Sequence, residues 1–227
     1  LLELTKPVAT AVVPISAGRH IYKREPSFPI AVACDPAFNF VYEANIRYLH
    51  HLGEVTYFSP LADTSLPDAG FVYLPGGYPE LYLAALSANR QMLQSIRRYV
   101  ESGGKLLAEC GGMMYLCDEI RDKNGYVYPM AGVLHQSATM ENMKLRLGYR
   151  TLLYNETRLK GHEFHYSRLV EQQNPLPSCA VAYTAKGVET DTPLYHYKNV
   201  WAGYTHLYWA DPVGNEWFTK FVIDGNI

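Results

Sequence analysis

The first half of the chain alternates short apolar runs with segments whose apolar residues recur at helical spacing. Four runs have the length and composition of buried strands: residues 29–34, 54–58, 71–74 and 105–110. Residues 40–52 and 87–102 carry apolar side chains at helical spacing, and Gly53 and Gly103 end them. Strands that alternate with helices predict an α/β fold with a mostly parallel, doubly wound sheet flanked by helices.

The pattern changes after about residue 125, where strand-like segments follow one another without helices between them. Three such segments are apparent: residues 147–153, 161–168 and 180–184. They predict an added antiparallel strand region in the second half of the chain. Residues 200–205 predict one more strand, which ends at His206, and residues 212–223 predict a closing helix.

Composition narrows the class of protein. The 227 residues are 48% hydrophobic, which is enough to bury a full core, and the net charge of −2 does not favour nucleic acid or an anionic membrane. No apolar run approaches the roughly 20 residues of a membrane-spanning helix. The four cysteines form neither a metal-binding pattern nor a disulfide framework, so we expect a cytoplasmic protein without a metal site.

The amino-terminal segment differs from the rest of the chain. Residues 1–28 are dominated by prolines and small residues and end in a polar stretch. We expect them to be a linker or the remnant of a preceding domain. Residues 29–227 then form the main domain.

The most informative stretch surrounds Cys110. A buried strand leads into this cysteine, Gly111 and Gly112 follow it, and residues 113–116 look helical. A strand that enters a helix through a tight glycine turn exposes the turn side chain, as in a nucleophile elbow. A helix N-terminus beside the sulfur would also lower the thiol pKa. The alternative is a buried structural cysteine, which we favour for the other three: Cys34, Cys117 and Cys179.

A second glycine turn follows the strand at 71–74. It comprises Pro75, Gly76 and Gly77, and the carboxyl ends of parallel strands lie at one edge of a sheet. Acyl transfer by a cysteine needs N–H donors for the oxyanion. We expect Gly111, together with Gly76 or Gly77, to supply them, although the turn could also be an ordinary one.

Two histidines compete for the role of general base. His206 ends a predicted strand and is our choice, although a histidine there could also be a core residue. His165 is the rival, in a strand segment that places Glu163, His165 and Ser167 on one face. Glu163 could anchor a substrate ammonium group. We expect substrate-binding side chains from this strand and from the segment that follows the glycine turn at 75–77. The candidates are Tyr78, Glu80, Glu163 and His165.

Several motifs together resemble one family. They are LPGGYPE (74–80), AECGGMMYL (108–116), LGYR (147–150), GHEFHYS (161–167) and YTHLYW (204–209). The stretch from about residue 30 to 209 resembles the C-terminal glutaminase domain of the cobyrinic acid a,c-diamide synthases. These domains are of the cobyric-acid-synthase type of class I glutamine amidotransferases.

The resemblance implies a function. Glutamine would be hydrolysed through a thioester on Cys110, with His206 as general base and acid. The ammonia would pass to a preceding ATP-dependent synthetase domain, which amidates the a and c carboxylates of a corrinoid precursor in cobalamin biosynthesis. ATP and Mg²⁺ would belong to that domain, and no cofactor is expected in this one. The expected partners are glutamine and, through the synthetase domain, the corrinoid; a homodimer is also compatible with the sequence.

Two positions depart from the broader class I pattern. Tyr208 stands where many members have glutamate two residues after the histidine, and Met114 stands where many have glutamine four residues after the cysteine. The runner-up within the family is the glutaminase domain of a nickel-sirohydrochlorin a,c-diamide synthase. The sequence is also compatible with a non-catalytic module that binds a tetrapyrrole or a partner domain, and with a cysteine peptidase or hydrolase.

Overall fold

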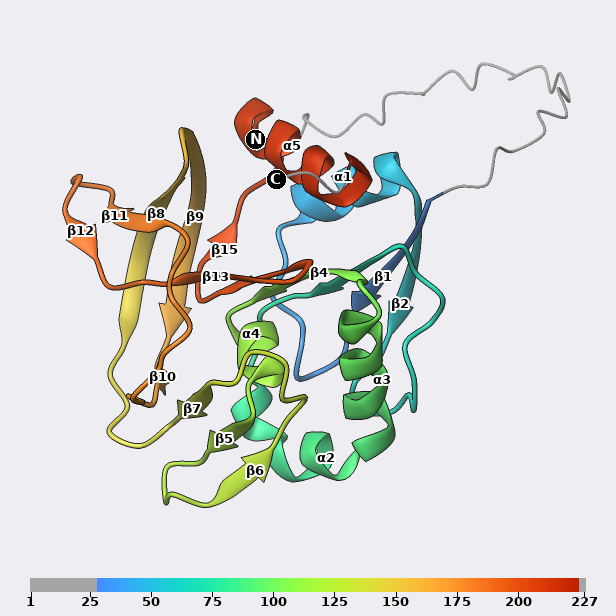
Figure 1. Ribbon diagram of the computed structural model, residues 1–227, viewed down its shortest axis with the longest axis vertical. Coiled ribbons are helices and arrows are strands. Elements are labelled where there is room, and N and C mark those ends of the chain that lie inside the picture. Colours follow the sequence, from blue (N-terminus) through green and yellow to red (C-terminus); the bar gives the residue numbers. More distant parts are fainter. Residues whose placement is uncertain (1–27, 225–227) are drawn as a thin grey trace, which may run out of the picture.

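The computed structural model describes residues 28–224 (Figure 1). The expected linker at 1–28 therefore lies almost entirely outside the described residues. Within the described range, no helix is long and apolar enough to cross a membrane.

A six-stranded sheet forms the centre, in the order β13-β14-β4-β3-β1-β2. Its strands are β1 (Pro29–Ala33), β2 (Glu54–Phe58), β3 (Phe71–Leu74), β4 (Lys105–Glu109), β13 (Leu194–Tyr197) and β14 (Val200–Gly203). All neighbouring pairs are parallel except β13 and β14. The four apolar runs of the first half are thus confirmed as strands of a mostly parallel sheet.

Helices cover both faces of this sheet, as the alternating pattern predicts (Figure 1). They are α1 (Glu43–Leu52), α2 (Leu83–Ala88), α3 (Arg90–Glu101), α4 (Gly111–Leu116) and α5 (Pro212–Thr219), and a π-helical turn (Lys220–Asp224) follows α5. Buried residues of α2, α3 and α4 pack in one cluster with Val72, Leu106 and Ala108. Leu49 of α1 and Phe218 of α5 pack in a second cluster on the other face.

The second half contains a five-stranded sheet in the order β12-β11-β8-β9-β15. Its strands are β8 (Arg146–Tyr154), β9 (Thr157–His165), β11 (Val181–Thr184), β12 (Glu189–Thr190) and β15 (His206–Leu207). Every pair in it is antiparallel, which confirms the added antiparallel region. Its inner face shares the second hydrophobic cluster through Leu152 and Leu159.

The prediction of one strand at residues 200–205 is wrong in one respect. β14 ends at Gly203 in the central sheet, and His206 begins β15 in the antiparallel sheet. The buried residues Tyr204 and Thr205 carry the chain from one sheet to the other. His206 therefore starts a strand and does not end one.

A small four-stranded sheet, β10-β7-β5-β6, was not predicted. Its strands are β5 (Glu119–Arg121), β6 (Val127–Pro129), β7 (Ser137–Thr139) and β10 (Arg168–Leu169). Strands of two or three residues are too short to show a period along the sequence.

Gly112 in α4 provides a test of how the first turn of this helix packs against β3. A Cβ atom at Gly112 would lie 2.1 Å from the carbonyl oxygen of Leu74, which is backbone and cannot move aside. Gly112→Ala should therefore lower the free energy of unfolding by at least about 3 kcal/mol in urea denaturation. Gly187→Ala is the control, because Gly187 has φ +77° but no atom within 4 Å of the added methyl group. It should cost only about 1 kcal/mol of strain, and equal losses in the two variants would contradict this account.

Candidate active site

Cys110 occupies the turn between β4 and α4. Its backbone has φ 48° and ψ −106°, a conformation that costs a non-glycine residue roughly 1–3 kcal/mol. Its amide donates a 2.7 Å hydrogen bond to the carbonyl oxygen of Gly203 in β14, and the residue is 4% exposed. A strained cysteine at a strand-to-helix turn has the geometry of a nucleophile elbow.

The glycine turn at 75–77 lies directly against this elbow. A Cβ atom on Gly111 would lie 2.7 Å from Cδ of Pro79 and 3.2 Å from the backbone nitrogen of Gly77. The backbones of Gly77 and Gly111 are therefore in contact beside Cys110. Two N–H groups from different segments are the usual composition of an oxyanion hole.

The electrostatics of Cys110 differ from the sequence-based expectation. Burial, followed by the nearby Glu80 carboxylate, raises the pKa of the thiol to about 12, and the Gly111 N–H opposes this shift only in part. The expected lowering of the thiol pKa by the helix N-terminus is thus wrong, because α4 is short and desolvation outweighs it. Cys110 is a neutral thiol at pH 7.

His206 lies with its ring against Gly76. A Cβ atom on Gly76 would come within 2.0 Å of Cε1 of His206, so any larger residue at that position would displace the imidazole. The Phe40 ring packs against the imidazole, with 4.3 Å between ring centroids. His206 is 3% exposed, and its Nδ1 atom is buried without a hydrogen-bond partner in the described part of the chain.

Burial also controls the protonation of His206. Desolvation, followed by repulsion from His162 and His165, lowers its pKa to about 3, and the opposing effect of Glu163 is smaller. The imidazole is therefore neutral at pH 7 and retains a nitrogen lone pair that can accept a proton.

The elbow, the glycine turn and β15 thus lie together. Within residues 28–224, the Cys110 thiol donates to the carbonyl oxygen of Phe164 at 3.8 Å and makes no hydrogen bond with His206. Hydrogen bonds between nucleophile and base commonly tighten only when the substrate is bound.

His165, the rival base, has its own partners. Its Nδ1 lies 2.8 Å from the Ser167 carbonyl oxygen, and its Nε2 lies 3.2 Å from Oε1 of Glu163. Its ring stacks on Tyr204 at 3.8 Å. Both ring nitrogens are thus engaged by oxygens of their own strand segment, and in the described residues neither makes a hydrogen bond with Cys110.

Glu163 is buried, and its negative charge is balanced by neighbouring groups. It pairs with Arg150 at 2.6 Å and accepts a 3.0 Å hydrogen bond from Thr192. Burial alone would raise its pKa, but His165, Arg150 and Thr192 together lower it, so it is ionised at pH 7. To bind Glu163 in the way expected from the sequence, a substrate ammonium group would have to compete with Arg150 for the carboxylate. The sequence analysis did not predict this ion pair.

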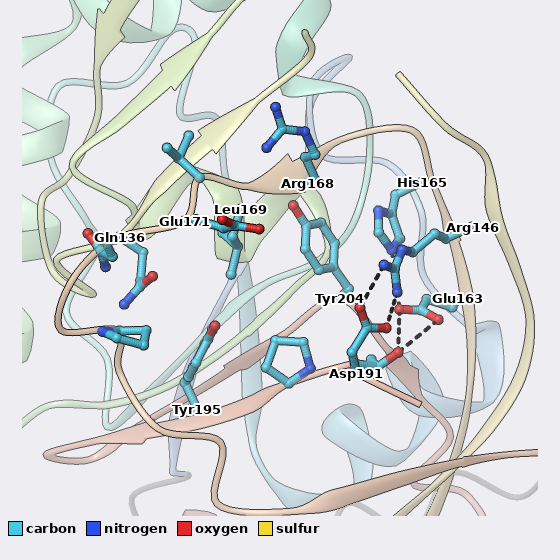
Figure 2. A pocket seen from close by; sticks show the side chains of 15 residues that line it. Gln136, Arg146, Glu163, His165, Arg168, Leu169, Glu171, Asp191, Tyr195 and Tyr204 are labelled. Atoms are coloured by element: carbon cyan, nitrogen blue, oxygen red, sulfur yellow. Dashed lines mark hydrogen bonds and ion pairs between the residues drawn. The ribbon is translucent and has the colours of Figure 1, made fainter. Parts of the chain in front are cut away.

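Glu163 and His165 also line a cavity of about 520 Å³, shown in Figure 2. Arg146 and Asp191 form an ion pair in its wall, and Tyr204 lines it as well. Neither Cys110 nor His206 is among the residues that line it, so this cavity is not where a thioester on Cys110 would form.

Glu80 and Tyr78, the two substrate-binding candidates that follow the glycine turn, differ in their exposure to solvent. Glu80 is half-buried close to Cys110, and burial raises the pKa of its carboxyl group. Tyr78 is exposed. Met114, four residues after Cys110, accepts a 3.2 Å hydrogen bond from the Ser167 hydroxyl at its sulfur. Among the described residues, no group of three or more His, Cys, Asp or Glu side chains could hold a metal ion.

The low pKa of His206 leads to a test of stability against pH. An unfolded histidine with a pKa of 6.5 is protonated at pH 5, whereas His206, with a pKa of about 3, stays neutral in the folded state. Its contribution to stability is complete above pH 6.5 and is lost as the pH falls towards 3. Between pH 7.5 and 5.0 the wild type should lose about 2 kcal/mol more than His206→Gln in urea unfolding. Equal losses would show that His206 is protonated normally.

Comparison with solved structures supports the fold. Chains of PurLQS and of a glutamine amidotransferase, both from Thermotoga maritima, superpose with TM-scores of 0.55 and 0.52, at 16% and 12% identity. Each match covers 87% of this chain, and the two matches cover 96% and 83% of those chains.

Comparison with known sequences identifies the family. A hydrogenobyrinate a,c-diamide synthase from Pseudomonas aeruginosa and a cobyrinate a,c-diamide synthase from Fusobacterium nucleatum are each 40% identical over 79% of this chain. The match spans 41% of the length of each relative. The model of the CobB/CobQ-like glutamine amidotransferase domain matches residues 29–213. With an elbow cysteine, a glycine turn and a buried histidine brought together within that span, the chain belongs to the CobB/CobQ-like glutamine amidotransferase domain family.

Proposed function

We propose that this domain hydrolyses glutamine through a thioester on Cys110 and supplies ammonia for the a,c-diamidation of a corrinoid. The observation that carries the proposal is the contact of the Cys110 elbow with the Gly76-Gly77 turn, on which the His206 ring also lies. Nucleophile, oxyanion donors and base are the three parts that acyl transfer from an amide requires.

The chemistry follows from the two neutral groups. As the sulfur attacks the glutamine amide carbon, His206 takes the thiol proton, and N–H groups of Gly111 and Gly76 or Gly77 stabilise the oxyanion. The imidazolium then protonates the leaving nitrogen, and ammonia departs. Water attacks the thioester, again with His206 as base, to release glutamate and restore the thiol. The proton moves only when the substrate provides the developing oxyanion, because Cys110 and His206 at rest both favour their neutral forms.

The ammonia acceptor would lie outside this chain. The match covers only 41% of each relative, and the family resemblance implies a preceding half that binds ATP and Mg²⁺, which we propose as the partner. The names of those relatives contain cobyrinate and hydrogenobyrinate, which favours a corrinoid over nickel-sirohydrochlorin as the ring that is amidated.

The outer face of β8 and β9 is where we propose that this half docks. Leu147 lies opposite Phe164, and Tyr149 lies opposite His162, so all four side chains share one face. Leu147 and Tyr149 are exposed. The His162 ring lies 5.9 Å from Tyr149 and 6.5 Å from His206, which links this exposed surface to the proposed base.

The nucleophile can be tested by labelling. A diazo-ketone analogue of glutamine should modify Cys110, as located by mass spectrometry of peptides, and Cys34→Ser should be labelled as the wild type is. In the complete protein, Cys110→Ser should abolish glutamine-dependent amidation but retain amidation with free ammonia. Labelling at Cys34, Cys117 or Cys179 in place of Cys110 would refute the assignment.

The partner can be tested by activation. In the described residues no carboxylate contacts His206, so the domain alone should hydrolyse glutamine slowly. Joining it to the ATP-dependent half should raise kcat at least about tenfold. Tyr149→Ser should reduce that activation, whereas Val188→Ser, a change of a similarly exposed residue between β11 and β12, should not. Full activity of the domain alone, or equal effects of the two variants, would contradict docking at this face.

A further inference from the structure

The strand that carries His206 has little sheet support of its own. β15 is two residues long, and its two Cα pairs are His206 with His162 and Leu207 with Gly161. It belongs to the antiparallel sheet, whereas Cys110 follows a strand of the central sheet. Ladder hydrogen bonds therefore do not fix His206 relative to Cys110.

A buried carboxylate provides that connection. Glu109 is the last residue of β4 and precedes Cys110. It is 2% exposed, and its side chain lies on the face of the strand opposite to that of Ala108. Its Oε1 accepts hydrogen bonds from the backbone N–H of Leu207 at 3.0 Å and from Nε1 of Trp209 at 3.4 Å. Its Oε2 accepts a 2.7 Å hydrogen bond from the Tyr73 hydroxyl of β3. One side chain thus ties β3 and β4 to the residue after His206.

Asn45 of α1 holds the same segment from the other side. Its Nδ2 donates to the Leu207 carbonyl oxygen at 2.8 Å, and its Oδ1 accepts from the backbone N–H of Trp209 at 3.0 Å. Both backbone polar groups of Leu207 are therefore bound by buried side chains, so the backbone that follows His206 has little freedom to shift.

We propose that Glu109 is a positioning residue, which holds His206 in register with Cys110 through its hydrogen bonds to Leu207 and Trp209. This inference rests on the proposed glutaminase function. A base displaced by about 1 Å can cost of the order of a hundredfold in rate, so a residue that never touches the substrate can control turnover.

The hydrogen bonds, and not the negative charge, should carry this role. The groups that face Glu109 are the Tyr73 hydroxyl, the Leu207 N–H and the Trp209 indole, with Tyr42 and Cys110 as the other titratable neighbours. Among the groups that act on Glu109 there is no cation, and burial raises its pKa to about 7. Glutamine could accept from Leu207 and donate to the Tyr73 hydroxyl, whereas methionine has similar length but neither bond.

The experiment compares Glu109→Gln with Glu109→Met in the complete protein, where glutamine hydrolysis is measured. Glu109→Gln should keep kcat within about threefold of the wild type. Glu109→Met should lower kcat about a hundredfold with little change in KM, and should slow labelling of Cys110 by the diazo-ketone to a similar degree. Phe221→Leu is the control for lost stability, because Phe221 belongs to the hydrophobic cluster that contains Leu207 and Trp209 but makes no hydrogen bond to Glu109. This variant should keep the kcat of the wild type.

NMR of the His206 imidazole provides a second measurement that needs no glutamine. In Glu109→Met the ring should titrate closer to pH 6.5, and in Glu109→Gln it should remain neutral as in the wild type. Unchanged titration in Glu109→Met, wild-type kcat in that variant, or equal loss in Glu109→Gln would overturn the inference. If the wild type neither hydrolyses glutamine nor reacts with the diazo-ketone, the proposed function fails, and the NMR comparison still decides whether Glu109 positions His206.

Discussion

Two consecutive residues of β4 and its turn join the parallel sheet to the strand that carries the proposed base. The amide of Cys110 binds the Gly203 carbonyl oxygen, and the carboxylate of Glu109 binds the Leu207 amide. The chain from Gly203 to Leu207 therefore leaves one sheet and enters the other between two fixed points. Because both contacts come from consecutive residues, a movement of the end of β4 would displace the proposed nucleophile and base together and preserve their relation.

Burial determines the charge state of this site. It raises the pKa of Cys110 and lowers that of His206, so the resting pair is uncharged. An ion pair formed before the substrate binds would place two desolvated charges in the interior, at a cost of several kcal/mol for each ion. A thiol held neutral in this way has low intrinsic reactivity, and in the proposed mechanism it attacks only where N–H donors such as that of Gly111 stabilise a developing oxyanion.

The features that were predicted from the sequence are those with a local cause. Apolar runs identified the central strands, and helical spacing identified the helices between them. Glycine pairs marked the turn at residues 75–77 and the turn at Cys110. The step from β14 to β15 could not be predicted, because residues 200–207 are continuously strand-like and only their distant partners, β4 and β9, assign them to different sheets. The expectation for the thiol pKa was wrong for the same reason, since burial depends on residues remote in sequence. The ion pair of Glu163 with Arg150 was likewise missed, because β8 and β9 bring those side chains together only in the folded chain.

The absence of a glutamate at position 208 has a structural counterpart in how the imidazole is held. Nδ1 of His206 faces no acceptor in the described residues, and the ring lies between Gly76 and Phe40. A carboxylate from another domain could reach Nδ1 only after a local rearrangement, because that atom is buried. In the proposed mechanism, ring packing and the hydrogen bond between Glu109 and the Leu207 backbone hold the imidazole in place, but neither supplies the negative charge that an orienting carboxylate has in a complete triad. A docking domain would then act on the base less by supplying a third residue than by pressing on the rings of Tyr149 and His162, which connect the exposed sheet face to His206.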